Sequence, residues 1–264
     1  MTGPDAAGAP VAPGRLTGVG VGPGDPGLLT RRALDVLARA DRVVAPTTSP
    51  DEAGRAEAVV RGALPDLEVT RLPFDMTGDG AGGAAARQAS HRAAAARLLP
   101  WLAAGEHVAF VTLGDPNIYS TFPSLVDAVR QHDPQVAVDT VPGITAFQEL
   151  ASRSATVLLD GTESLALVTA LDGPAHLAEA LDRGASAIVV YKGGRHVPAL
   201  ASLLRRADRL EGAVLGELLG LPGERIAPLA EAADGPASYL ATVIVPPARP
   251  GGSPSPDPGS DRPT

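Results

Sequence analysis

The chain of 264 residues has no cysteine, and its only lysine is Lys192. The missing thiols exclude disulfides, thiolate metal ligands and cysteine nucleophiles. No apolar run approaches the roughly 20 residues that cross a bilayer, so we expect no membrane association. Runs of basic residues are missing too, and 22 basic against 30 acidic residues give a net charge of −8. Because nucleic-acid affinity comes mainly from neutralised phosphates, we expect no nucleic-acid partner.

Both ends of the chain are rich in proline and glycine and have no periodic apolar pattern. We expect residues 1–14 and 246–264 to be disordered tails. The first of these segments contains no basic residue and no apolar core of a secretion signal. This favours a cytoplasmic protein. The folded core, Arg15 to Val245, is long enough to bury a substantial hydrophobic core.

Within the core, short β-branched runs alternate with segments of helical period, which is typical of the α/β class. We predict one α/β domain over residues 15–141 and a second over residues 142–245. Little sequence separates the last strands, so the second sheet is expected to be mixed. The predicted strands are Leu16–Val21, Arg42–Ala45, Glu68–Leu72, His107–Leu113, Val136–Thr140, Leu165–Thr169, Ala185–Tyr191, Ala213–Glu217 and Tyr239–Val245. The predicted helices of the first domain are Gly27–Ala40, Ser49–Leu64, Ala84–Ala104 and Ser120–Gln131.

A glycine-rich segment, Gly18 to Gly27, follows the first predicted strand. Its last six residues match the dinucleotide pattern G-x-G-x-x-G, but Pro23 and Pro26 remove two of the N–H groups that would bind pyrophosphate. We interpret Asp25 as a helix N-cap and Pro26 as the first helical residue. A plain tight turn is the alternative.

The glycine-rich segment contains Gly24-Asp25-Pro26. A second Gly-Asp-Pro sequence, Gly114 to Pro116, follows the apolar strand that ends near Leu113. Open α/β sheets bind ligands at such strand ends. Glycine lets a ligand approach the backbone, and Asp115 could hold an ammonium or hydroxyl group. The alternative is a helix cap followed by proline. Two such loops on neighbouring parallel strands favour a shared ligand site.

The segment Val141–Phe147 lies at the predicted domain junction. Thr145 could cap a helix or bind a ligand hydroxyl, and an ordinary linker turn is the alternative.

A basic turn closes the most β-like run of the second half. It brings together Lys192, Arg195 and His196, which suits an anionic substrate, although the same sequence is also compatible with a solvated loop.

The five histidines are at least 16 residues apart, so no helical metal pair exists and we expect no metal. Neither a nucleophile elbow nor a phosphate-binding P-loop is present.

In their order and in their residues, these motifs resemble those of the tetrapyrrole methylases, S-adenosylmethionine-dependent enzymes of corrinoid and sirohaem synthesis. The resemblance covers essentially the whole core. Three tracts look like the branch that methylates precorrin-2 at C-20: Leu72–Asp79, Phe110–Phe122 and Lys192–His196. Val44-Ala45-Pro46-Thr47 stands where the uroporphyrinogen branch has a Tyr-Asp-Arg run. The catalytic base therefore stays unknown, since the aspartate assigned to that role has no counterpart here.

The resemblance implies two α/β domains with a ligand cleft between them, S-adenosylmethionine as the methyl donor, and a homodimer. The donor-binding residues that it carries over are Pro23, Gly114, Asp115, Ile118, Thr145, Ala146, Tyr191 and Thr242. Candidates for binding the tetrapyrrole are Tyr119, Phe122, Lys192, Arg195 and His196. For Tyr119 and Phe122, the alternative is that both are core aromatics of the following helix.

The leading expectation is methylation of precorrin-2 at its C-20 meso carbon to give precorrin-3A. This chemistry needs little acid–base machinery, because the sulfonium methyl is already activated and catalysis is mostly positioning and water exclusion. A sister methylase acting on cobalt-factor II or on another ring carbon is the alternative enzyme. A non-catalytic ligand-binding module is the alternative from another class.

Overall fold

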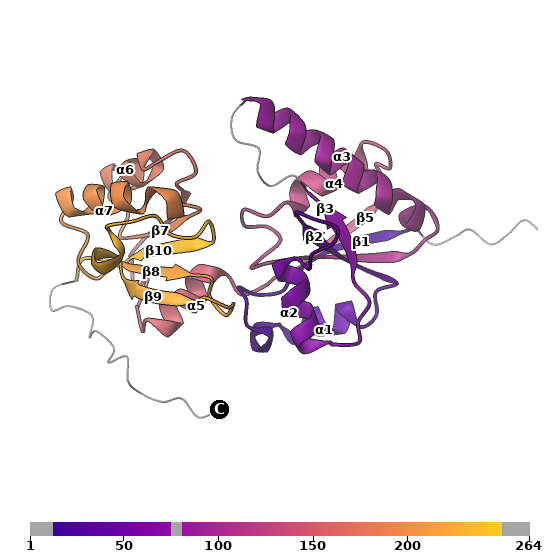
Figure 1. Ribbon diagram of the computed structural model, residues 1–264, viewed down its shortest axis with the longest axis horizontal. Helices are drawn as coiled ribbons and strands as arrows, with labels where there is room; N and C mark the ends of the chain where they lie inside the picture. The colour runs from indigo at the N-terminus through magenta and orange to yellow at the C-terminus, as the bar shows by residue number, and fades with distance from the viewer. Residues whose placement is uncertain (1–12, 75–80, 250–264) are drawn as a thin grey trace, which may run out of the picture. The chain divides into compact units, whose positions relative to one another are not determined.

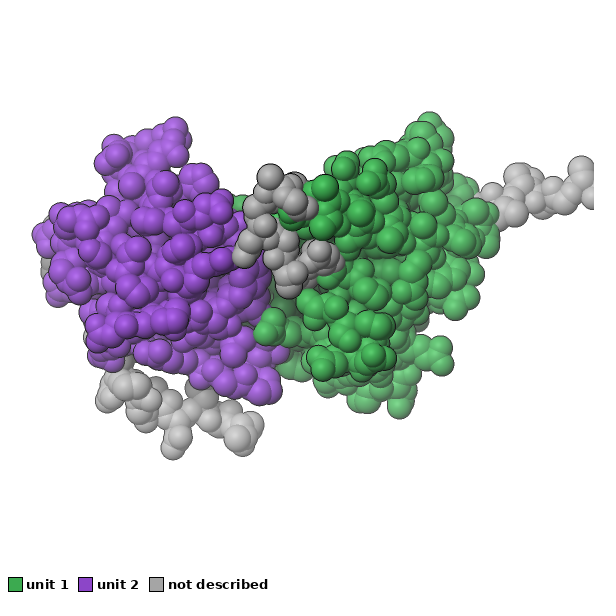
Figure 2. All heavy atoms as spheres, turned by 45° about the horizontal axis from the view of Figure 1, so that its top comes forward, with its two compact units in different colours: residues 1–144 green, residues 145–264 purple. Residues whose placement is uncertain are grey.

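The computed structural model describes residues 13–74 and 81–249 (Figure 1). The chain separates into two compact units between Ile144 and Thr145, coloured separately in Figure 2. Residues 75–79 of the tract beginning at Leu72, and most of the expected tails, lie outside the described residues.

The first unit contains a five-stranded sheet in which every pairing is parallel, with the order β3-β2-β4-β1-β5. All five strands were predicted from the alternation of β-branched and helical segments. Their bounds are β1 (Arg15–Gly20), β2 (Arg42–Thr47), β3 (Thr70–Pro73), β4 (His107–Thr112) and β5 (Ala137–Val141).

Helices cover both faces of this sheet (Figure 1). On one face, α1 (Arg31–Leu37) and α2 (Arg55–Ala63) pack over a core that includes Val19, Val43 and Val111. On the other face, α3 (Ala81–Ala103) and α4 (Phe122–Arg130) pack over Leu16, Phe110 and other buried residues. The first half is therefore a doubly wound α/β unit.

The helix expected over Gly27–Ala40 is divided in the structure. The 3₁₀ helix η1 (Pro26–Leu28) begins at Asp25, whose Oδ1 accepts a hydrogen bond from the Gly27 N–H at 2.7 Å. This confirms the N-cap interpretation of Asp25. Leu29 is extended, and α1 starts afresh with Thr30 as its cap, since the Thr30 hydroxyl accepts from the Ala33 N–H at 3.1 Å. Because Asp25 and Thr30 each cap the start of a helix, the segment forms two short helices rather than one long helix.

The helix expected from Ser49 begins only at Arg55. The Thr47 hydroxyl donates to the carbonyls of Ser49 and Glu52, at 2.7 and 3.0 Å. These bonds hold the intervening residues in turns, so helical periodicity alone placed the start of α2 too early.

The second unit has a mixed sheet of order β6-β7-β10-β8-β9, which confirms the expectation of mixed pairing. On one face, α6 and α7 pack with η3, and on the other lies α5. The strand β9 was not predicted. The strands are β6 (Leu165–Thr169), β7 (Ala187–Tyr191), β8 (Val214–Glu217), β9 (Arg225–Pro228) and β10 (Ala241–Val245). The helices are α5 (Ala146–Arg153), α6 (Ala175–Asp182), η2 (Gly194–His196), α7 (Val197–Arg206) and η3 (Leu229–Ala232).

The folded part extends beyond Val245, where we expected it to end. The Arg249 guanidinium donates to Glu163 Oε1 at 2.9 Å and to the Val157 carbonyl at 3.3 Å. These contacts hold the chain against the second unit as far as residue 249. Within residues 13–74 and 81–249, every helix is too short or too polar to cross a bilayer.

Candidate functional site

The strands β1 and β4 are neighbours at the centre of the first sheet, and the chain leaves them toward opposite faces. After β1 it continues to α1 on one face, and after β4 to α4 on the other. Such a topological switch point opens a crevice at the carboxyl ends of the strands, where α/β proteins bind ligands. Both Gly-Asp-Pro loops lie there, as the sequence predicted.

The two loops are joined by their backbones. The Gly114 N–H donates to the Gly22 carbonyl at 2.8 Å, which forms an antiparallel bridge within an otherwise parallel sheet. A Cβ added to Gly143 would lie 2.0 Å from the Gly114 carbonyl oxygen, so only glycine permits this approach. Pro23, next to Gly22, is buried. The loops after β1, β4 and β5 are therefore packed backbone against backbone.

Asp115 ties these loops together through its side chain, which is only 9% exposed. Its Oδ2 accepts from the Gly143 N–H at 3.0 Å, and its Oδ1 accepts from the Asn117 N–H at 2.8 Å. Each carboxylate oxygen thus already has a backbone donor. The sequence suggested a carboxylate that holds a ligand, whereas the geometry makes Asp115 a residue that orders the loops around one.

Gly114 borders open space. Its φ is +66°, and a Cβ added to it would meet no heavy atom within 4 Å. A ligand can therefore approach this backbone closely, which fits an S-adenosylmethionine site. Ile118 is half-buried in the same loop, and its N–H donates to the Asp115 carbonyl at 3.3 Å.

The two aromatic candidates after this loop have different surroundings. Tyr119 is 45% exposed and has a φ of +49°, an unusual conformation for a non-glycine residue. Burial of part of the ring raises the pKa of its hydroxyl. Phe122 is only 2% exposed, and its ring stacks on Phe110 with centroids 5.9 Å apart. The core interpretation therefore holds for Phe122, and we remove it from the site.

The second unit brings together its four predicted donor residues. Thr145 is the N-cap of α5, and Ala146 is the first residue of that helix. The Tyr191 hydroxyl accepts from the Phe147 N–H at 3.2 Å, which places it at the start of α5. Thr242 is 1% exposed and lies opposite Tyr191 where β10 pairs with β7. These residues surround one helix N-terminus.

The basic turn follows β7 directly. Lys192 has a φ of +57°, and burial lowers the pKa of its ammonium group. Arg195 is exposed. The His196 ring is bound through Nε2 to the Leu171 carbonyl at 3.2 Å, so one of its two nitrogens is occupied. The three basic residues lie on one short turn, although their environments differ.

Sequence reasoning missed a buried carboxylate at the same edge of the first sheet. Glu57, fully buried, pairs with Arg61 and Arg71. The spacing of four residues between Glu57 and Arg61 on a predicted helix could have indicated the first pair. Nothing in the sequence indicated the second. Gly143 was likewise noted only as a break in the pattern.

The fold and this geometry define an α/β protein of two units, with glycine loops that border open space at the switch point of the first sheet. The model of the family Tetrapyrrole (Corrin/Porphyrin) Methylases matches residues 15–233. The chain belongs to this family of methyltransferases.

Individual relatives agree with this assignment. The chain is 35% identical to a precorrin-2 C(20)-methyltransferase of Sinorhizobium, covering 89% of this chain and 96% of the relative. It is 32% identical to the cobalt-precorrin-2 C(20)-methyltransferase of Salmonella typhimurium, covering 88% and 96%. The solved uroporphyrin-III C-methyltransferase of Thermus thermophilus, in complex with S-adenosylhomocysteine, superposes with a TM-score of 0.61. It is 25% identical and covers 88% of this chain and 97% of that one.

Proposed function

We propose that this protein methylates precorrin-2 at C-20, giving precorrin-3A and S-adenosylhomocysteine, in corrinoid synthesis. The observation that carries the proposal is the 35% identity to a precorrin-2 C(20)-methyltransferase over almost the full length of both chains. The replacement of the uroporphyrinogen branch's aspartate by Pro46 also supports it. We further propose a cytoplasmic homodimer.

Bound S-adenosylmethionine supplies an electrophilic methyl group on its sulfonium. The protein's part is to bind and orient. Gly114 leaves room for the donor, while Asp115 fixes the backbones of the loops that border this space. Pro23 and Ile118 belong to the same loops. We assign donor contacts in the second unit to the N-terminus of α5, through Thr145, Ala146, Tyr191 and Thr242.

The remaining candidates are assigned to the tetrapyrrole. Tyr119 offers an exposed ring in a strained backbone conformation beside the Gly114 loop, which suits stacking on a macrocycle. Lys192 and Arg195 supply positive charge for the substrate's carboxylates, and His196 lies on the same turn. Such a site accelerates methyl transfer mainly by alignment and by water exclusion.

The experiment incubates the pure protein in parallel with precorrin-2, its cobalt form and uroporphyrinogen III, together with labelled S-adenosylmethionine. Mass spectrometry should find one added methyl on precorrin-2. Methylation of uroporphyrinogen III alone would refute the proposal. A preference for the cobalt form would favour the second candidate, cobalt-precorrin-2, which the Salmonella relative's name supports.

A further inference from the structure

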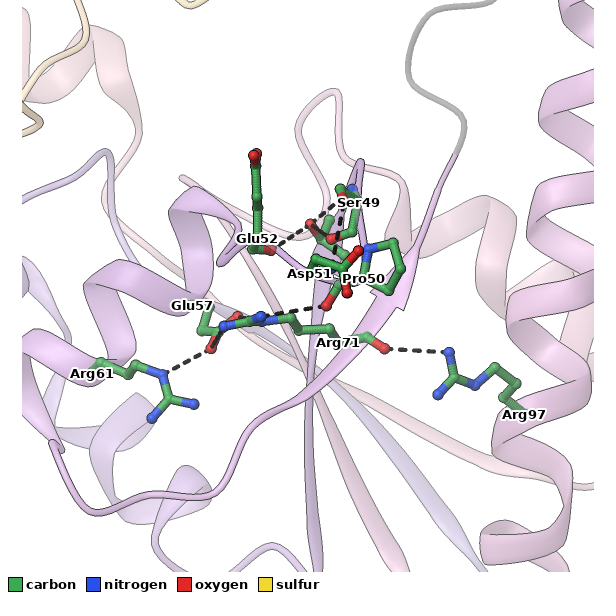
Figure 3. Close-up of polar contacts among 9 residues, drawn as sticks. Ser49, Pro50, Asp51, Glu52, Glu57, Arg61, Arg71 and Arg97 are labelled. Atoms are coloured by element: carbon green, nitrogen blue, oxygen red, sulfur yellow. Dashed lines mark hydrogen bonds and ion pairs between the residues drawn. The ribbon is translucent and has the colours of Figure 1, made fainter.

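A buried carboxylate in the first turn of α2 gathers two arginines around it (Figure 3). Glu57 Oε2 accepts from Arg71 Nε at 2.7 Å, and its Oε1 accepts from Arg71 Nη2 at 3.1 Å. Arg61, one helical turn further along α2, donates through Nε to Oε1 at 2.8 Å. The Glu57 side chain is 0% exposed, whereas those of Arg61 and Arg71 are 43% and 30% exposed. The acid is hidden and the two cations reach the surface.

The pairing between Glu57 and Arg71 favours the charged form of both groups. Burial alone would raise the pKa of Glu57, but hydrogen bonds and charges from Arg71 and Arg61 outweigh it and leave the pKa below its usual value. The hydrogen bond to Glu57, and the more distant charge of Asp51, raise the pKa of Arg71. A buried ion pair is seldom more stabilising than apolar packing of the same volume. Stability of the fold therefore does not by itself account for one carboxylate holding two guanidiniums.

The same cluster fixes the loop between β2 and α2. Arg71 Nη1 donates to the Pro50 carbonyl at 3.3 Å, and Arg97 Nη1 donates to the Arg71 carbonyl at 3.4 Å. Glu52, from the same loop, points its side chain away from Glu57 (Figure 3). The cluster is therefore tied to the loop after β2 and to the first half of β3, where Arg71 pairs with Ala45 in the second half of β2.

This position lies at the edge of the sheet that carries the glycine loops. Because α2 follows β2, its first turn stands at the carboxyl ends of the strands. Neighbouring strands are about 4.8 Å apart, so β3 lies about 14 Å from β1 across the sheet. A tetrapyrrole with carboxylate side chains extending from its rim is wide enough to span that separation.

Both arginines keep donors available. Within the described residues, Arg61 donates hydrogen bonds only through Nε, which leaves both of its Nη groups for another acceptor. Arg71 uses each Nη group once. A guanidinium held in place binds a carboxylate at a smaller entropic cost than a mobile one, and its planar fork matches the two oxygens.

We propose that Arg61 and Arg71, held by Glu57, receive a carboxylate side chain of the tetrapyrrole substrate. Glu57 is then a positioning residue that never touches the substrate. The inference rests on the proposed function. It explains how a chain of net charge −8 binds a polyanion, since attraction must come from local cations.

The first test is Arg61→Gln, with Arg42→Gln as the matched control. Arg42 makes the same kind of pair with Glu106, also at 2.7 Å, but at the start of β2 and so at the opposite edge of the sheet. Arg61→Gln should raise KM for precorrin-2 about tenfold, as expected for a lost charge-assisted contact, and much more than it lowers kcat. S-adenosylhomocysteine affinity by calorimetry should stay unchanged. Arg42→Gln should leave KM unchanged.

The second test separates positioning from a merely structural role. Glu57→Gln keeps both arginines charged but removes the anion that orients them, so KM should rise several-fold in protein that circular dichroism shows to be folded. Arg71→Lys, which keeps the charge without the fork, should raise KM as well. A lower melting temperature with unchanged KM in all three cluster variants would overturn the inference.

A binding assay without turnover keeps this test independent of the proposed function. Fluorescence titration with uroporphyrin III, which carries eight carboxylates, should give weaker binding to the Arg61→Gln variant than to the unmodified protein. Coproporphyrin III, with four carboxylates, should be affected less. If precorrin-2 is not methylated but this difference appears, the carboxylate site stands and the proposed reaction fails. Equal uroporphyrin binding by the two proteins would refute the site.

Discussion

At the scale of single residues, Gly114 offers the most direct test of the donor site. A Cβ at this position would enter open space, but the φ of +66° also strains any substituted residue. Gly184 is a matched control, because its φ is +73° and a Cβ there also meets no atom within 4 Å. Gly114→Ala should weaken S-adenosylhomocysteine binding at least tenfold by calorimetry, and Gly184→Ala should not.

Both substitutions should lower the melting temperature by a similar amount, since the backbone strain is alike. Equal donor affinity in both variants would remove the Gly114 loop from the donor site. Gly114→Val, with a larger side chain, should weaken binding further.

His91 should make stability dependent on pH. Its Nε2 is buried without a hydrogen-bond partner among the described residues, and its ring packs 5.4 Å from that of Phe74. Burial lowers the pKa of His91, so the unfolded chain binds the proton more tightly. As pH falls below about 6.5, the unfolded state is protonated first and the free energy of unfolding decreases.

His91→Phe removes this contribution and the unsatisfied nitrogen. Urea unfolding at pH 7.5 and pH 5.5 should show a smaller loss of stability on acidification in the variant. Some loss should remain, because burial also lowers the pKa of His107. An equal loss in both proteins would show that His91 titrates normally.

At the scale of secondary-structure elements, Phe122 joins the start of α4 to the sheet. It is the first residue of that helix, and a Cβ added to Gly18 of β1 would lie 2.6 Å from its ring. Phe122→Ala should therefore cost about 3 to 5 kcal/mol of stability, measured by chemical denaturation. Phe122→Leu, which keeps most of the volume, should leave KM for the tetrapyrrole unchanged. A raised KM in a stable Phe122→Leu protein would return this ring to the substrate site.

The sequence predicted the elements where one pattern dominates. Apolar runs bounded by turn residues identified the five strands of the first sheet, and Asp25 was recognised as a cap by its place before Pro26. The sequence placed the start of α2 too early, because periodicity does not represent the local hydrogen bonds of the Thr47 side chain. The strand β9 is four residues long, ends in proline and, among the described residues, pairs only with β8, so its sequence carries little strand signal.

The candidate site also has features that the sequence predicts and features that it does not. Glycine loops at strand ends follow from chain order, so their meeting at β1 and β4 was predictable. The pairing of Glu57 with Arg71 depends on how α2 lies over the edge of β3, and fourteen residues separate the two in sequence. The role of Asp115 as a tie also required coordinates, because its partner Gly143 belongs to another loop.

At the scale of the whole molecule, the proposed homodimer has a simple test. Two copies of the 26.7 kDa chain should give a light-scattering mass of twice that value at micromolar concentration. The expectation comes from the family resemblance, and closed twofold assemblies are the commonest form of homo-oligomer. A mass near that of one chain would contradict it.

The single lysine gives the whole chain one side-chain amine. Because burial lowers the pKa of Lys192, more of this amine is unprotonated at mildly alkaline pH than in an ordinary lysine. Reductive methylation would therefore attach an isotopic label to one side chain, directly after β7, in addition to the α-amino group, with no substitution needed. The NMR signal of that label would report on the surroundings of the basic turn in the unmodified sequence, both during ligand titration and during turnover.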